Sequence, residues 1–278
     1  MRTLFRIGMG LVIIGVLVFV GFYIAGGSIF FPTQDTSYEL TELYYDADQF
    51  DEIIIRMYNK PIDIFPSETD QIKIVYYESE KNWVDVTEDG LTITFQNEVD
   101  RFLGIFTWFD WINVSRYTEC SLYLPVGTVY SIDAATSNGA LSIQDIIDLD
   151  QVEMTSSNGR ITIDSVSVAG DLDLQTSNGK IELTDVSVGG STSLSTSNGP
   201  IAIENYQGDE LDAHTSNGEI NVEIIGLVSD YERSMNTSNG SVYLDDAKID
   251  EGSFNNSAAK SITLSTSNGN IHLNFSND

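Results

Sequence analysis

Residues 176–183 read Thr-Ser-Asn-Gly-Lys-Ile-Glu-Leu, and this pattern returns throughout the second half of the chain. Ser-Asn-Gly occurs seven times, at steps of 20, 20, 20, 19, 22 and 29 residues, and apolar residues follow each glycine two and four positions later. The turn pairs are Asn138-Gly139, Asn158-Gly159, Asn178-Gly179, Asn198-Gly199, Asn217-Gly218, Asn239-Gly240 and Asn268-Gly269. Such a period predicts a repeat architecture, in which one short unit recurs and stacks on its neighbours.

Two folds can use this turn, because Asn-Gly readily adopts positive φ. In a hairpin, Leu174 would face Leu183 across Asn178-Gly179. In a β-solenoid, Asn-Gly marks a corner and each coil pairs in parallel with the next. Side-chain register permits both, but recurrence of the same letters favours the solenoid, in which Thr points inward, Ser outward, and Asn amides stack on Asn amides. We therefore expect an all-β β-solenoid of coils of about 20 residues, with a β-meander or sandwich as the alternative.

The N-terminal segment carries a different pattern. Residues 7–31 contain no charged side chain, and at about 1.5 Å per residue such a run crosses a membrane as a helix. Arg2 and Arg6 precede it and an acidic chain follows, which predicts a cytoplasmic N-terminus and an extracytoplasmic remainder at the cell membrane. A cleaved signal peptide ending near residues 25–27 is the competing interpretation.

The remaining chain divides by composition. We expect a cytoplasmic tail (1–6), a transmembrane anchor (7–31), a linker (32–36), an N-terminal β region (37–130) and the repeat solenoid (131–278). An aromatic insert at residues 102–112 interrupts the β region. It either covers the β core or forms an interface with a membrane or partner, and the candidate contacts are Phe106, Trp108, Phe109 and Trp111.

The net charge of the chain excludes one class of partner. The chain has 13 basic and 42 acidic residues, for a net charge of −29. Such a surface repels phosphate backbones, so we expect no nucleic-acid partner.

Cys120 is the single cysteine, so no intramolecular disulfide forms, and its alternating context predicts a buried side chain.

Residues that could carry chemistry are few. The two histidines, His214 and His272, occupy variable polar positions of the repeats, and no nucleophile elbow, phosphate loop or Cys/His metal cluster is present. We expect no catalytic residues and no cofactor. Acidic residues follow the motif glycines by five or six positions, and stacked carboxylates could hold Ca²⁺ or form a solvated row. The candidates for a cation row are Asp164, Asp185, Glu204, Glu223 and Asp245.

Ser-Leu-Tyr-Leu-Pro-Val-Gly at residues 121–127, followed by repeated Thr-Ser-Asn-Gly-x-Ile-x-Ile, resembles a prokaryotic family of β-strand-repeat proteins labelled "putative adhesin", a domain of unknown function. The resemblance covers about residues 40–278. It implies a β-solenoid-like extracytoplasmic domain that is often membrane-tethered and sometimes linked to envelope stress responses. It implies no enzymatic activity and no established ligand.

The expected function is therefore non-enzymatic. A membrane-anchored extracytoplasmic β-repeat protein fits adhesion or cell-envelope interaction, with an envelope glycan or protein as the partner. The alternative is a regulatory or sensory ectodomain of an envelope-stress system that acts through a membrane partner. A polysaccharide-acting enzyme fits poorly, because arginine and lysine are sparse.

Overall fold

The computed structural model describes residues 38–78, 82–87, 91–97, 119–250, 252–254 and 257–276. Tyr38–Asp278 is a compact unit of its own. The predicted anchor (7–31) and the aromatic insert (102–112) lie outside the described residues. Among the residues that are described, no helix has the length and apolar character needed to cross a membrane.

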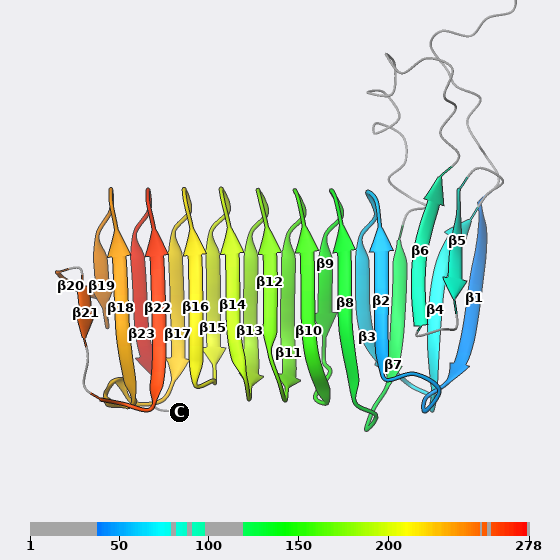
Figure 1. Cartoon of the computed structure of the whole chain (residues 1–278), viewed down its shortest axis with the longest axis horizontal. Coiled ribbons are helices and arrows are strands. Elements are labelled where there is room, and N and C mark those ends of the chain that lie inside the picture. The colour runs from blue at the N-terminus through cyan, green and yellow to red at the C-terminus, as the bar shows by residue number, and fades with distance from the viewer. Residues whose placement is uncertain are drawn as a thin grey trace, which may run out of the picture. The chain divides into compact units, whose positions relative to one another are not determined.

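The described chain is built from β-strands in two layers (Figure 1). Hydrogen-bonded neighbours in layer 1 are β5 (Asn82–Thr87), β6 (Leu91–Asn97), β2 (Glu52–Met57), β8 (Tyr130–Thr136), β10 (Leu149–Ser156), β12 (Leu172–Thr176), β14 (Ser191–Thr196), β16 (Glu210–Thr215), β22 (Lys260–Thr266), β18 (Tyr231–Thr237) and β21 (Gly252–Phe254). Those in layer 2 are β1 (Glu39–Asp46), β4 (Gln71–Glu78), β7 (Cys120–Pro125), β3 (Ile62–Ser67), β9 (Leu141–Gln144), β11 (Ile161–Val168), β13 (Ile181–Val188), β15 (Ile201–Tyr206), β17 (Ile220–Ile225), β23 (Ile271–Ser276), β19 (Val242–Leu244) and β20 (Ala247–Ile249). One 3₁₀ turn, η2 (Val228–Asp230), precedes β18.

Each central coil places one strand in each layer and joins them by the Ser-Asn-Gly turn. Val152 pairs with Leu172, and Leu172 pairs with Thr192, in parallel register and twenty residues apart. The strand before each turn therefore pairs with the neighbouring coils and not with the strand after the turn, as β12 and β13 illustrate. The solenoid is confirmed, and the hairpin that would pair Leu174 with Leu183 is wrong.

The core lies between the two layers. Strand residues alternate between buried and partly or fully exposed positions, and in β11 the buried Ile161 and Ile163 flank a partly buried residue. Parallel register stacks Ile143, Ile163 and Leu183 into one column. Burying each such side chain stabilises the fold by roughly 1.5–3 kcal/mol. Because the columns continue from coil to coil, the core needs no disulfide, and Cys120 is buried within it.

Antiparallel strands close both ends of the parallel stack. At one end, β4 pairs with β7, β1 pairs with β4, and β5 pairs with β6, all antiparallel. At the other end, β20 pairs with β19 and β21 pairs with β18. Short or reversed end strands reduce the tendency of a parallel stack to recruit another chain.

The order of coils in space departs from the order in sequence at both ends. The final coil, β22 and β23, lies between the coil β16–β17 and the coil β18–β19 (Figure 1). At the opposite end, the coil β2–β3 lies between β6–β7 and β8–β9. The last strands of the chain, β22 and β23, and two of its first strands, β2 and β3, are therefore each paired on both sides and do not lie at an end of the stack.

Candidate functional site

The Ser-Asn-Gly turns line one edge of the solenoid, where their asparagines form a single chain of hydrogen bonds. Each Nδ2 donates to the Oδ1 of the asparagine in the next coil. The donor–acceptor distances for the six pairs that begin at Asn158 and end at Asn239 are 2.5–2.9 Å. In spatial order the members are Asn59, Asn138, Asn158, Asn178, Asn198, Asn217, Asn268 and Asn239. All amides point the same way, so neighbouring bonds polarise one another.

The threonine of the motif supports the turn from inside the core. Thr215 is fully buried, and its hydroxyl donates to the carbonyl of Gly199 in the neighbouring coil at 3.0 Å. The same oxygen accepts the backbone N–H of Gly218 at 3.1 Å. Ser156 makes the same two bonds where serine replaces threonine. The motif hydroxyl therefore satisfies one buried donor and one buried acceptor, which would otherwise be costly to bury.

The expectation of positive φ at Asn-Gly is wrong. No described motif asparagine or glycine has a positive φ. Glycine is required because coils approach closely. A Cβ on Gly179 would lie 1.8 Å from the carbonyl oxygen of Gly159. Positive φ occurs instead directly after β9 and at bends within β11, β13 and β15, at short polar residues of the kind that adopt left-handed backbone most readily; the residues are Asp145, Ser165, Asp185 and Asn205.

One turn of the asparagine chain was missed by motif matching. Oδ1 of Asn59 accepts a hydrogen bond from Nδ2 of Asn138, and Lys60 takes the place of the motif glycine. Met57 takes the threonine position opposite Thr136. The available signal was spacing, because Ile62 and Ile64 follow Lys60 at the same offsets that apolar residues follow each motif glycine.

The five acids proposed for a cation row occupy different positions. Thr184 separates Asp164 from Glu204 in the parallel register, so these two carboxylates are not on adjacent strands. Asp185 lies one residue further on and accepts a hydrogen bond from Asn205 at 2.9 Å.

The two remaining acids also have neutral neighbours. Glu223 lies opposite Asn274, and Asp245 accepts the N–H of Phe275 at 3.0 Å. In the part of the chain that the structure describes, no three His, Cys, Asp or Glu side chains are grouped so as to hold a metal ion.

The groups with the largest pKa changes belong to the core. Burial raises the pKa of the Cys120 thiol to about 12, which keeps it protonated and unreactive. Burial likewise raises the pKa of Tyr206 to about 12, and its hydroxyl lies 2.6 Å from that of Thr192. Burial lowers the pKa of Lys60 to about 8. These shifts reflect packing, since none of these groups lines an open cleft with a reactive partner.

The histidines lie on the outer faces of different layers. His214 is exposed on β16, and its Nδ1 lies 2.9 Å from the Ser265 hydroxyl. His272, on β23, stacks on Tyr243 with ring centroids 4.5 Å apart, and its Nε2 lies 3.2 Å from Glu219. Neither contacts a serine–acid pair arranged for nucleophilic catalysis.

An aromatic strip crosses four strands on the outer face of layer 2. Cross-strand pairing aligns Phe65 with Tyr123, Tyr123 with Lys73, and Lys73 with Tyr44. The Lys73 ammonium lies 5.6 Å from the ring centroid of Tyr44 and 5.8 Å from that of Tyr123. It also pairs with Glu42 at 2.8 Å, which raises the pKa of Lys73 and lowers that of Glu42. The strip offers aromatic surface with its charges internally paired.

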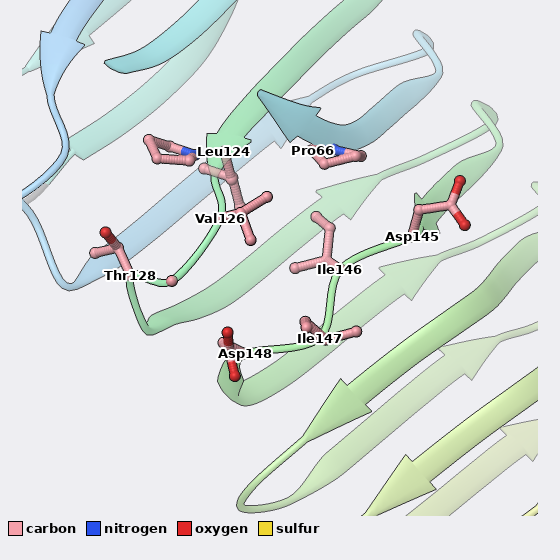
Figure 2. A pocket seen from close by; sticks show the side chains of 10 residues that line it. Pro66, Leu124, Val126, Thr128, Asp145, Ile146, Ile147 and Asp148 are labelled. Atoms are coloured by element: carbon pink, nitrogen blue, oxygen red, sulfur yellow. The ribbon is translucent and has the colours of Figure 1, made fainter. Parts of the chain in front are cut away.

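A small pocket lies near the bends that follow β7 and β9 (Figure 2). Its empty space of about 240 Å³ includes open solvent. Two exposed apolar side chains border it, Val126 at 68% and Ile147 at 61% exposure. Asp145 and Asp148 also line it, but their carboxylates do not point toward one another (Figure 2). The arrangement suits an apolar contact and not acid–base chemistry.

The fold and its edge define a class: a two-layer β-solenoid built on stacked Thr-Ser-Asn-Gly turns, with core-packed titratable groups. The family model described as Toastrack DUF4097 matches residues 50–274, and the chain belongs to this family. No curated protein sequence matches it.

Three solved structures are similar to this chain at low identity. A protein from Bacteroides fragilis described as a "putative adhesin" is 14% identical, with a TM-score of 0.49, over 86% of this chain and 97% of the other. A protein from Clostridium sporogenes described as a "putative cell adhesion protein" is 12% identical, with a TM-score of 0.39, over 86% and 100%. A Parabacteroides distasonis protein described as a "putative lipid binding protein" is 14% identical, with a TM-score of 0.36, over 85% and 97%.

Proposed function

We propose that this protein is a non-enzymatic surface protein that presents its solenoid for adhesion or cell-envelope interaction. One observation carries the proposal: parallel register arranges outward side chains into straight columns along each layer. Asp133, Glu153 and Asp173 form one such column on layer 1, with about 4.8 Å between strands. A repeated face of this kind suits an extended partner better than a small substrate.

The negative charge of the surface limits the chemical class of the partner. Glu153 and Asp173 are exposed, and the chain carries a net charge of −29, so anionic polymers are repelled. The aromatic strip, by contrast, presents the rings of Tyr44 and Tyr123 beside Lys73, whose charge is paired with Glu42. A neutral envelope glycan or a basic protein segment therefore fits these faces. Residues 7–31 would anchor the chain in the cell membrane with its N-terminus in the cytoplasm, which places the solenoid outside.

The second candidate is a regulatory or sensory ectodomain that acts through a membrane protein. The exposed apolar residues Val126 and Ile147 favour it, because they border the same pocket and grouped exposed apolar side chains are typical of protein–protein contacts. The aromatic insert at residues 102–112 is a separate candidate for such a contact.

Binding by cells that display the full chain tests both candidates. Adherence to purified neutral envelope glycans is expected to fall for Tyr44→Ser, which alters the strip. Tyr58→Ser is the matched control, because Tyr58 is an even more exposed tyrosine on the turn edge, at 68% against 49%. Cross-linking to membrane proteins that is lost in Ile147→Asn would support the regulatory candidate. No glycan adherence and no cross-linked partner would contradict the proposal.

External protease tests the anchor in the same cells. Digestion of the solenoid in intact cells, with the remaining fragment kept in the membrane fraction, is expected for an uncleaved anchor. Release of the whole solenoid into the medium without protease would contradict anchoring and support a cleaved signal peptide.

A further inference from the structure

The seven Asn-Gly pairs differ in how the structure restrains them. Asn-Gly is the sequence most prone to spontaneous deamidation, because the unhindered N–H of glycine can attack the asparagine side chain. Five motif glycines, among them Gly139 and Gly218, donate this N–H to the motif hydroxyl at 2.8–3.3 Å. Gly240 and Gly269 make no such bond within the described part of the chain, although the Thr237 hydroxyl oxygen lies beside Gly240 and donates to the carbonyl of Gly269.

The end of the asparagine chain adds a second difference. Every other member accepts an amide from its neighbour, but Asn239 only donates, to Asn268 at 2.9 Å. Its Oδ1 receives no hydrogen bond from the described residues. Gly240 is also exposed, Gly269 is half-buried, and the other five motif glycines are buried. Three separate observations therefore converge on the pair in the outermost coil.

We propose that Asn239 is a site of spontaneous deamidation and that the stacked turns protect the six other Asn-Gly pairs. The Gly240 nitrogen loses its proton to water and attacks Cγ of Asn239. The side-chain amide leaves as ammonia, and a five-membered succinimide forms. Water then opens either carbonyl, giving aspartate or isoaspartate, so the net reaction consumes one water and releases one ammonia.

The restraints set the expected order of rates. An interior pair must break the glycine–threonine bond and both amide bonds of its asparagine before the nitrogen can reach Cγ. We expect deamidation at Asn178 to be roughly 100-fold slower than at Asn239, which corresponds to about 3 kcal/mol. Asn268 should fall between them, because Gly269 lacks the bond to threonine while both amide groups of Asn268 are engaged.

Peptide mapping of the folded full chain, kept in mildly alkaline ¹⁸O-water and analysed by mass spectrometry with isoaspartate detection, tests the order. Label should accumulate first at Asn239, then at Asn268. In denaturant the seven pairs should react at similar rates, which would show that folding and not sequence sets the difference. Equal rates in the folded chain, first reaction at an interior pair, or no reaction at Asn239 would overturn the proposal.

A substitution tests the protecting role of the hydroxyl. Thr176→Val frees the Gly179 N–H, which Thr176 otherwise accepts at 3.2 Å. Deamidation at Asn178 is expected to rise several-fold relative to Asn198 in the same molecule, and Thr176→Ser should leave the ratio unchanged. Because both rates are compared within one folded chain, a general loss of stability cannot mimic the result. An unchanged ratio in Thr176→Val would overturn protection by the hydroxyl.

Discussion

The buried motif hydroxyl gives the sharpest test of what holds neighbouring coils together. Thr215→Val keeps the shape of the side chain and removes its oxygen. The carbonyl of Gly199 and the N–H of Gly218 then lose their partner inside the core. Leaving a buried polar group unsatisfied costs about 1–3 kcal/mol. We therefore expect Thr215→Val to lower the free energy of unfolding by about 2–4 kcal/mol.

Thr215→Ser is the matched variant, because it keeps the oxygen and removes only a methyl group. Loss of one buried methyl costs about 1 kcal/mol. Ser156 shows that serine makes both bonds at this position. Hydrogen bonding therefore predicts that valine is worse than serine, whereas apolar packing alone predicts the reverse.

Urea unfolding followed by circular dichroism measures the difference, with the slope against urea checked for each variant, because repeat proteins can unfold in stages. Native-state hydrogen exchange at the Gly218 amide provides a local measurement. If Thr215→Ser were more destabilising than Thr215→Val, the motif threonine would act by packing, and the explanation given for its recurrence would be refuted.

Three further results are expected. Gly179→Ala should destabilise strongly, by about 3 kcal/mol or more, because its Cβ would lie 1.8 Å from the Gly159 carbonyl and the coils must separate; a thermal melt near that of the wild type would contradict this. Burial lowers the pKa of Lys60 from 10.5 to about 8, so between these values the unfolded chain binds more protons and stability rises with pH. Lys60→Met should flatten that rise in urea unfolding series, and an unchanged pH dependence would show that Lys60 is solvated. Tyr206→Phe leaves the buried Thr192 hydroxyl without its 2.6 Å partner and should cost about 1–2 kcal/mol by calorimetry, whereas a neutral result would mean that water replaces the phenol.

The period of the sequence predicts the stacking correctly because each coil repeats the same local problem. Thr176, Asn178 and Gly179 meet copies of themselves in the next coil, so the same letters are required each time. The backbone conformation of the turn was not predictable from local preference. A carbonyl twenty residues away excludes a side chain at Gly179, and this contact exists only in the folded stack.

Two other features also depend on contacts between distant parts of the chain. Asn59-Lys60 lacks the motif letters, yet it joins the asparagine chain because its coil stacks on the coil of Asn138. The aromatic strip brings Tyr44, Lys73 and Tyr123 together through reversed end strands, and no period relates these residues. Sequence motifs therefore predict the residues of the Ser-Asn-Gly turns but do not predict the aromatic strip.

The enclosed final coil has a consequence for how the fold is completed during synthesis. Until residues 260–276 emerge, the coil of β16–β17 has an open parallel edge, and the coil of β18–β19 lacks the neighbour on which it stacks. A chain that stops before residue 260 does not simply lose one terminal repeat. It leaves unpaired strand edges on two separate coils, and such edges recruit other chains. Pairing of residues 260–276 therefore covers strand edges on two coils that would otherwise be open to other chains.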